Sequence, residues 1–283
     1  MSDYIESIHS YPLTGAHSVD TPQATVNNGG IVGDREFMLY LPHQGPEGLG
    51  ERVNQKSSSE ARRLTLIHAS DIITEEGHGV ELLMPAPFES IIIMDTDETD
   101  SLTTLVNEFG VPTPVVDQGD TNAKAFESLL ELPGVRLGRK ALEWLWPTIE
   151  EARTRKVRPI HIVTTSTIQE LQTRCGSEEI TANRFRPNLV ISTEAEPFAE
   201  NRWVGKTLVI GGLHIAITKL TARCPIPSYN QETGVNMKDV AKLYPGLEKN
   251  DNNKPVIGVY GQPLLDVHWD TRRIALSQAV HIL

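Results

Sequence analysis

Short runs of apolar residues, separated by glycine, proline and small polar residues, dominate the first hundred positions of the chain. Runs of this length between such breaks are typical of β-strands. The pattern predicts strands at 36–41 (EFMLYL), 64–68 (LTLIH), 80–84 (VELLM) and 90–94 (SIIIM).

Two later stretches favour helices because each ends at residues that stop a helix. One covers 99–110 (TDSLTTLVNEFG) and ends in glycine; the other covers 122–134 (NAKAFESLLELPG) and ends in Pro-Gly. The segment between them, 111–120 (VPTPVVDQGD), is rich in proline and small polar residues and is predicted to be a loop.

The second half of the chain alternates strand-like runs with one clear helix. A strand at 159–165 (PIHIVTT) leads into a helix at 166–175, where Ser166 or Thr167 is expected to cap the first turn. Further strands are predicted at 188–193, 206–220 and 273–283, and 206–220 is expected to fold into a hairpin at Gly211-Gly212. The pattern predicts a mainly β fold with short helices (α+β).

Composition restricts the class of protein. The 283 residues contain 39% hydrophobic and 22% charged residues, close to globular averages. The net charge of −11 argues against nucleic acid as a partner, since phosphate binding needs a basic surface. We expect no signal peptide and no membrane span, because neither a charged leader with an apolar stretch nor a run of about 18 apolar residues occurs. A cytoplasmic location is the expectation.

Basic residues gather between 136 and 158, after an acidic stretch. This segment contains Arg136, Arg139, Lys140, Arg153, Arg155, Lys156 and Arg158. It is interpreted either as a solvated linker, which places the domain boundary nearby, or as the lining of a cleft for an anionic ligand.

Two segments have the chemistry of a phosphate site. In 183–191 (NRFRPNLVI), strand alternation predicts Phe185 on one face and both Arg184 and Arg186 on the other. A guanidinium matches phosphate geometry, although a pair of strand-edge ion pairs is the alternative. In 164–171 (TTSTIQEL), a hydroxyl-rich turn opens a helix, whose free N–H groups attract anions; many such turns are only caps.

The third segment, 221–227 (TARCPIP), contains Cys224, one of only two cysteines. A thiolate is a soft metal ligand or a nucleophile, and the neighbouring Arg223 favours the thiolate form. Two nearby prolines, Pro225 and Pro227, restrict the loop. The alternative is a small buried hydrophobe, the usual role of a lone cysteine. Cys175, at the end of its predicted helix, is interpreted as structural or incidental.

Taken in order, these segments resemble the MOSC family, named after the C-terminal domain of molybdenum-cofactor sulfurase. The resemblance rests on the run from ANRFRPNLVIS through FAENRW to TARCPIPSYNQETG. The N-terminal SIHSYPLTG and GGIVGDREFMLY are similar to the β-barrel domain that precedes it in the amidoxime-reducing component. The resemblance implies an N-terminal β-barrel-like domain with a helical insert at 1–134 and a C-terminal MOSC β-barrel domain at 135–283.

The resemblance also implies a molybdenum cofactor, molybdopterin with its metal, held between the two domains. Cys224 then corresponds to the residue that binds molybdenum through its thiolate and serves catalysis. Residues that hold the pterin and its phosphate correspond to Arg35, Thr165, Ser166, Arg186 and Asn188, and the sequence pattern adds Arg184 and Arg223.

The implied activity is the reduction of small N-hydroxylated substrates by a molybdenum enzyme. The chain lacks the four cysteines of an appended iron–sulfur cluster, so a separate electron-transfer protein is expected. Thr14 stands where the family usually has a lysine. Two alternatives therefore stay open: a non-redox carrier of sulfur or of the cofactor, and a degenerate binding module that has lost the pterin.

Overall fold

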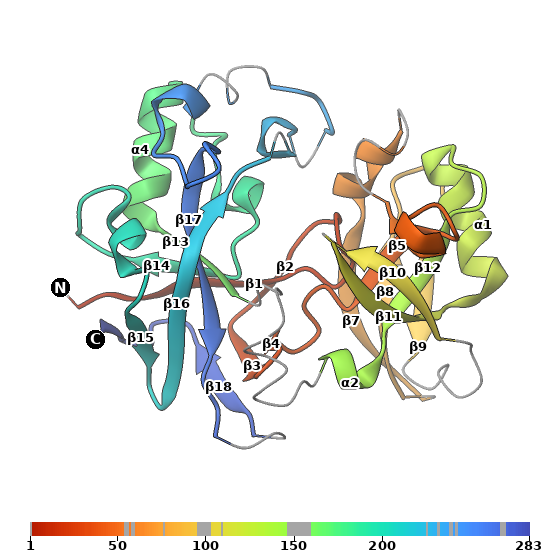
Figure 1. Cartoon of the computed structure of the whole chain (residues 1–283), viewed down its shortest axis with the longest axis horizontal. Coiled ribbons are helices and arrows are strands. Elements are labelled where there is room, and N and C mark those ends of the chain that lie inside the picture. The colour runs from red at the N-terminus through yellow and green to blue at the C-terminus, as the bar shows by residue number, and fades with distance from the viewer. Residues whose placement is uncertain are drawn as a thin grey trace. The chain divides into compact units, whose positions relative to one another are not determined.

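The structure is a computed structural model (Figure 1), in which residues 2–53, 57, 60–75, 77–94, 103–108, 110–145, 160–224, 226–230, 233–237, 240, 243–266 and 270–283 are described. Its contacts divide the chain into two compact units. The first unit contains Met1–Ser10, Asp20–Val32 and Trp146–Leu283; the second contains Tyr11–Val19 and Gly33–Leu145. The two family domains expected from the sequence, at 1–134 and 135–283, stay a prediction. The compact units defined by contacts have different bounds, because the first unit also contains Met1–Ser10 and Asp20–Val32.

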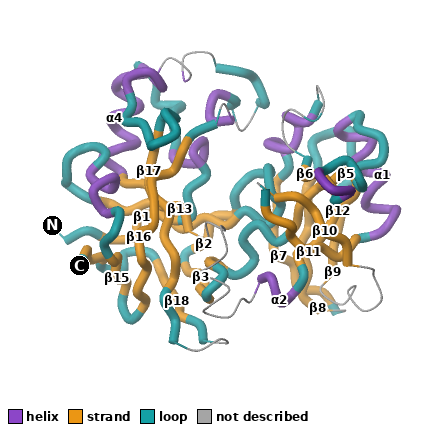
Figure 2. The backbone as a smooth tube through the Cα atoms, in the orientation of Figure 1, coloured by secondary structure: helices purple, strands orange, loops and turns teal. Residues whose placement is uncertain are grey.

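The second unit is built on a closed β-barrel, and strands make up most of its regular structure (Figure 2). The barrel order is β10-β11-β12-β5-β6, from Thr103–Glu108, Val111–Asp117, Arg136–Lys140, Phe37–Leu41 and Gly50–Arg52. A three-stranded sheet, β7 (His68–Thr74), β8 (Gly77–Leu83) and β9 (Ile91–Met94), and the helices α1 (Gly119–Leu130) and α2 (Leu142–Leu145) complete the unit. The expected barrel-like N-terminal domain is thus confirmed as a closed barrel.

The predictions for 99–110 and 111–120 were wrong. Thr103–Glu108 and Val111–Asp117 form the antiparallel hairpin β10–β11, in which Val106 pairs with Thr113 and Glu108 with Val111. Residues 99–102 of the predicted helix lie outside the described residues. Gly110 adopts a positive φ of 84° and makes the turn of a hairpin instead of the end of a helix. Val106 and Val115 are fully buried against Met38 and Tyr40, so barrel packing decides the conformation of a segment whose local pattern is ambiguous.

A smaller correction concerns the predicted strand at 64–68. Leu64 belongs to a 3-10 helix, Ala61–Leu66, and the strand β7 begins only at His68. Leu64 and Ile67 are buried in the core of the second unit, which explains their apolar character without a strand.

The first unit contains an eight-stranded sheet in the order β19-β15-β16-β17-β13-β14-β1-β2. In chain order these are β1 (Tyr4–Ser10), β2 (Val19–Thr21), β13 (Ile160–Thr164), β14 (Leu189–Ser192), β15 (Thr207–Ile210), β16 (Leu213–Ala222), β17 (Val256–Pro263) and β19 (Val280–Ile282). A small sheet of β18 (Arg272–Ala275), β3 (Gln23–Asn27) and β4 (Gly30–Ile31) accompanies it. The expected hairpin at Gly211-Gly212 is confirmed by the pairing of Ile210 with Leu213.

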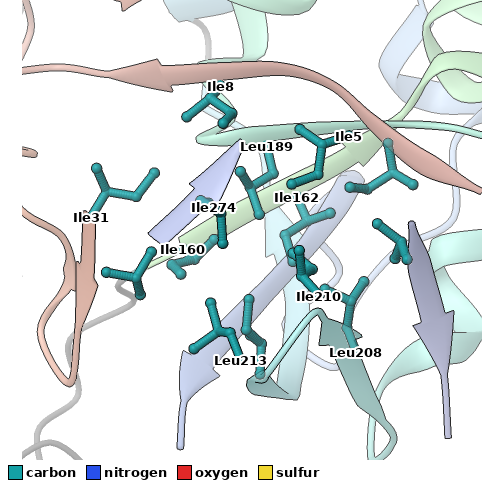
Figure 3. Close-up of a cluster of buried hydrophobic side chains, with 14 of the residues drawn as sticks. Ile5, Ile8, Ile31, Ile160, Ile162, Leu189, Leu208, Ile210, Leu213 and Ile274 are labelled. Atoms are coloured by element: carbon teal, nitrogen blue, oxygen red, sulfur yellow. The ribbon is translucent and has the colours of Figure 1, made fainter. Parts of the chain in front are cut away.

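The large sheet curves until strands far apart in its order meet. Val280 N donates to Asp3 O at 2.8 Å, Ile5 N donates to Gln278 O at 3.0 Å, and Tyr4 bridges to Ala279. These bonds join β1 to the residues that enter β19. The curved sheet encloses a core whose side chains come from β1, β13, β14, β15 and β18 and point into one space (Figure 3).

A second apolar cluster covers the outer side of this sheet. It joins Val163 and Ile257 of the sheet to Ile168 and Leu171 of helix α4 (Thr165–Cys175) and to Phe185. Each side of β13 therefore packs on a core, which is why its five residues are all buried.

Strand β17 carries a bulge in its pairing with β16. Leu220 pairs with Val259 but Ala222 pairs with Val256, so two residues of β17, Ile257 and Gly258, fall outside the regular register. Gly258 has φ 77°, and a Cβ there would lie 2.4 Å from Ile162 O. The bulge lies next to the end of β16, two residues before Cys224.

Candidate functional site

The topology brings two of the predicted segments to one edge of the sheet. Strands β13 and β16 both pair antiparallel with β17, so they run in the same direction, and their carboxyl ends lie at the same edge (Figure 1). Thr164 ends β13 and opens helix α4, while Ala222 ends β16 and leads to Arg223 and Cys224. The hydroxyl turn and the cysteine therefore lie on the two sides of the first residues of β17.

Cys224 is exposed, which removes the interpretation as a buried hydrophobe. Its backbone is held by Tyr244, whose hydroxyl donates to Cys224 O at 3.0 Å. Burial, reinforced by the charge of the Cys224 thiolate, raises the pKa of Tyr244 to about 12, so the phenol keeps its proton and its donor role at neutral pH. Cys175 is half-buried and packs against the cluster under α4, as a structural cysteine does.

The N-cap of helix α4 lies before both residues that were expected to cap it. Thr164 is the N-cap, and its Oγ1 accepts from Thr167 N, so the expected cap at Ser166 or Thr167 was wrong. Ser166 Oγ lies 3.2 Å from Thr164 Oγ1, and Thr165 Oγ1 accepts from Thr193 N at 3.3 Å. The N–H groups of Thr165 and Ser166 open the helix, where backbone donors have no partner within the helix itself.

A buried carboxyl group supports this turn, and sequence reasoning missed it. Glu200 is completely buried, and its Oε2 accepts from the hydroxyls of Thr164 and Thr167, each at 2.9 Å. Burial raises the pKa of Glu200, while the hydroxyl hydrogen bonds oppose the shift. The sequence signal for this carboxyl group was the motif FAENRW, in which an acidic residue lies between Phe198 and Trp203.

The segment 182–186 is not a strand, and the predicted alternation of its arginines was wrong. Residues Ala182–Phe185 form a 3-10 helix, and Arg186 follows in a left-handed conformation with φ 57°. A non-glycine residue held there costs free energy, and such residues gather at functional sites. The carbonyl of Arg186 lies 3.2 Å from Nδ1 of the buried His161.

Arg184 and Arg186 therefore differ in their surroundings. The guanidinium of Arg184 is buried and donates to three carbonyl oxygens, those of Glu179, Pro227 and Tyr229, and to the sulfur of Met237. Burial lowers the pKa of Arg184, which the nearby Glu179 carboxylate counters. Its donors are engaged within the protein.

Asn188 is likewise engaged in the sheet. Its Oδ1 accepts from His161 N at 3.0 Å, and its Nδ2 donates to His9 O at 3.2 Å. The side chain is fully buried and connects β13 with β1.

Arg35, the remaining candidate, belongs to the second unit. It too has a left-handed backbone, with φ 52°, and its N donates to Tyr11 O at 2.8 Å. Its guanidinium pairs with Asp34 and lies 5.0 Å from the centre of the Tyr11 ring. Its part in cofactor binding stays a prediction from the resemblance.

The basic stretch 136–158 is paired with acids where the structure describes it. Arg136 binds Asp117 and Asp120, Arg139 binds Glu36, and Lys140 Nζ lies 3.0 Å from Glu108 Oε2. These are ion pairs of the barrel of the second unit. The basic residues from 153 to 158, and Pro225 in the cysteine loop, lie outside the described residues.

The first unit is thus a β protein that presents an exposed thiol and a helix N-terminus at one edge of a curved sheet. Residues 150–274 match the family model of the MOSC domain, and this part of the chain is a MOSC domain. The match includes Cys224, the hydroxyl turn and the segment 182–188. MOSC domains are associated with binding of the molybdenum cofactor.

Two solved structures resemble the chain at low identity. The YUAD protein of Bacillus subtilis is 9% identical, with a TM-score of 0.42, and the alignment covers 100% of this chain and 96% of that protein. YiiM from Geobacillus stearothermophilus is 13% identical, with a TM-score of 0.30, over 44% of this chain and 54% of that protein. None of the curated proteins matches the chain.

The described residues include no cluster of three or more His, Cys, Asp or Glu side chains suited to hold a metal ion. Among the helices that the structure describes, none has the length and apolarity to cross a membrane.

Proposed function

We propose that this protein binds a molybdopterin-type cofactor in its MOSC domain, with the Cys224 thiolate as a ligand of the metal. The observation that carries the proposal is the position of Cys224, exposed at the same sheet edge as the N-terminus of α4, within a chain segment that matches the MOSC family. The thiolate can bind the metal of such a cofactor, and the N–H groups at the helix N-terminus can bind its phosphate.

The chemistry of the remaining residues fits this cofactor. Thr165, Ser166 and Arg186 would bind the phosphate, and Arg186 occupies the strained conformation expected of a binding residue. Cys224 supplies a single ligand, so the metal would keep the ligands of the pterin. Arg184 and Asn188, whose donors are engaged in the protein, are assigned to holding the site and not to the cofactor itself.

We further propose that the protein reduces N-hydroxylated small molecules. The N–O bond of the substrate breaks as two electrons and two protons are added, which leaves the amine or amidine and one water. When bound, the molybdenum would supply the two-electron reduction, and its electrons would come from a separate electron-transfer protein. The protein's own contribution is to fix the metal through Cys224 and to bind the phosphate.

The test compares two cysteine variants after expression with ample molybdate. Cys224→Ser is expected to lose molybdenum, because a hydroxyl is a poor replacement for a soft thiolate. Cys175→Ser, the matched control on α4, is expected to retain it. Elemental analysis of purified protein is the measurement, and equal molybdenum in wild type and both variants contradicts the ligand assignment.

The exposure of Cys224 also favours a second candidate, a non-redox carrier that holds sulfur or the cofactor for delivery. Reduction of benzamidoxime to benzamidine by the loaded protein with a chemical electron donor separates the two. Cofactor transfer to an apo-enzyme, without reduction of benzamidoxime, identifies the carrier.

A further inference from the structure

Two arginines cross-connect the segments that contain Arg186 and Cys224. Arg223, next to Cys224, donates from Nη1 to Phe185 O at 2.8 Å, and Phe185 is next to Arg186. In the opposite direction Arg184, next to Phe185, donates from Nη1 to Pro227 O at 3.2 Å and Tyr229 O at 3.4 Å, just beyond Cys224. Each segment thus sends a guanidinium to the backbone of the other.

The two guanidinium groups restrain a loop that strand pairing does not hold in place. Cys224 lies beyond the end of β16, outside the ladder that fixes a strand. The described residues that follow it form a short 3-10 helix, Ile226–Ser228, and a single bridge between Tyr229 and Asn236. A metal ligand must be held within about 0.5 Å of its place. Backbone and phenol bonds also reach this loop, from Arg223 N to Pro255 O, from Tyr244 Oη to Cys224 O and from Met237 N to Ser228 O. The two arginines add the side-chain connections between this loop and the segment that contains Arg186.

Arginine suits this role because its planar fork reaches several acceptors at once. Arg184 is only 2% exposed, and its Nε also donates to Glu179 O at 2.6 Å. A lysine has its donors on one nitrogen and cannot reach Glu179 O on one side and the two loop carbonyls on the other.

We infer that Arg184 and Arg223 form a reciprocal clamp that sets the position of Cys224 relative to Arg186, and that both are positioning residues and not ligands. The contribution of this clamp to cofactor binding rests on the proposed function. The clamp itself is a property of this chain and can be measured without a cofactor.

The primary measurement is hydrogen exchange of the amides of Tyr229 and Asn230, which bond to Ile226 O and Val235 O within the loop. In Arg184→Met, which keeps the length of the side chain but has no donors, these amides are expected to exchange at least about tenfold faster, because local opening of the loop becomes easier. Arg184→Lys is expected to show most of the same increase, since charge alone does not restore the fork.

General destabilisation is controlled by Leu208→Ala. Leu208 is fully buried in the core enclosed by the sheet, whereas Arg184 donates to Met237, which packs against the other cluster. We expect this variant to lower the melting temperature while leaving the two loop amides within about twofold of the wild-type rate. Loop exchange that rises equally in Leu208→Ala and Arg184→Met, or that returns to the wild-type rate in Arg184→Lys, overturns the clamp.

Molybdenum content per chain, measured after incubation of the same proteins with molybdopterin cofactor released from another molybdenum enzyme, tests the link to function. Arg184→Met is expected to retain several-fold less molybdenum than Leu208→Ala. Fast loop exchange with wild-type molybdenum retention overturns the positioning role. Wild-type protein that takes up no molybdenum contradicts the proposed function, and the exchange rates still decide the clamp.

Discussion

At the scale of single residues, the fold opposes the ionisation of the buried Glu200. Its pKa is raised by burial, so the folded protein holds a proton that the unfolded chain releases above about pH 4.3. The stability associated with this proton is fully present below that pH and is lost as the pH rises toward the folded-state pKa. The slope is about 1.4 kcal/mol for each pH unit in that window.

Glu200→Gln removes this titration while keeping an oxygen that accepts from Thr164 and Thr167. We expect the free energy of unfolding of the variant, relative to wild type, to rise as the pH increases from about 4.3 toward the folded-state pKa of Glu200. Urea unfolding at a series of pH values measures it. Glu196→Gln, at an exposed position of the same segment, is the control and should show no such trend. A difference that stays constant with pH contradicts a raised pKa.

Arg186 allows a second prediction at this scale. Arg186→Ala is expected to weaken cofactor retention by about 1.5–3 kcal/mol, the usual value of a hydrogen bond to a charged group. Replacing a strained left-handed arginine by alanine leaves its backbone conformation equally unfavourable, so the melting temperature of the cofactor-free protein should change little. A collapse of the cofactor-free protein shows instead that Arg186 is structural.

At the scale of elements, the bulge of β17 shapes the end of β16 from which Cys224 projects. Gly258→Ala places a Cβ 2.4 Å from Ile162 O and 2.7 Å from His161 Nε2, at a φ that favours glycine. We expect a loss of about 1–3 kcal/mol of stability. Gly212→Ala is the matched control in the β15–β16 hairpin, because no atom lies within 4 Å of the added Cβ. Thermal unfolding of both variants is the measurement, and equal effects contradict the role of the bulge.

At the scale of the whole molecule, each of the two units has an apolar core and a polar network of its own among the described residues. In the barrel of the second unit, burial favours a raised pKa for Asp117, but hydrogen bonds from Arg136, Tyr40 and the Gly119 amide outweigh it and lower the pKa. The stability that these bonds contribute is present above about pH 4 and is lost as the pH falls through the folded-state pKa.

Asp117→Asn is therefore expected to destabilise the second unit by about 1–3 kcal/mol at pH 7 and progressively less below pH 4. Calorimetry together with hydrogen exchange, resolved by unit, measures the effect. The core amides of the first unit serve as the internal control and should keep their exchange rates. An effect of the same size in both units contradicts independent networks.

Much of this organisation could be predicted from the sequence, because the signals are local. The strand at 160–164, the helix that follows it and the hairpin at Gly211-Gly212 each combine a clear hydrophobic period with a cap or turn residue. The family motif around Cys224 also indicated an available thiol, and Cys224 is exposed. A motif can be recognised from sequence because it consists of residue types in a fixed order along the chain.

Tertiary structure decided what these local patterns left ambiguous. The strands Thr103–Glu108 and Val111–Asp117 form a hairpin because the barrel buries Val106 and Val115, although Gly110 is equally suited to end a helix. Arg184 and Arg186 are two residues apart, yet Arg184 is buried among carbonyl groups and Arg186 has a left-handed backbone. The two arginines differ because this segment forms a 3-10 helix instead of a strand. Whether an arginine binds the protein or a ligand depends on which acceptors surround it, and those come from residues about 40 positions away in the chain.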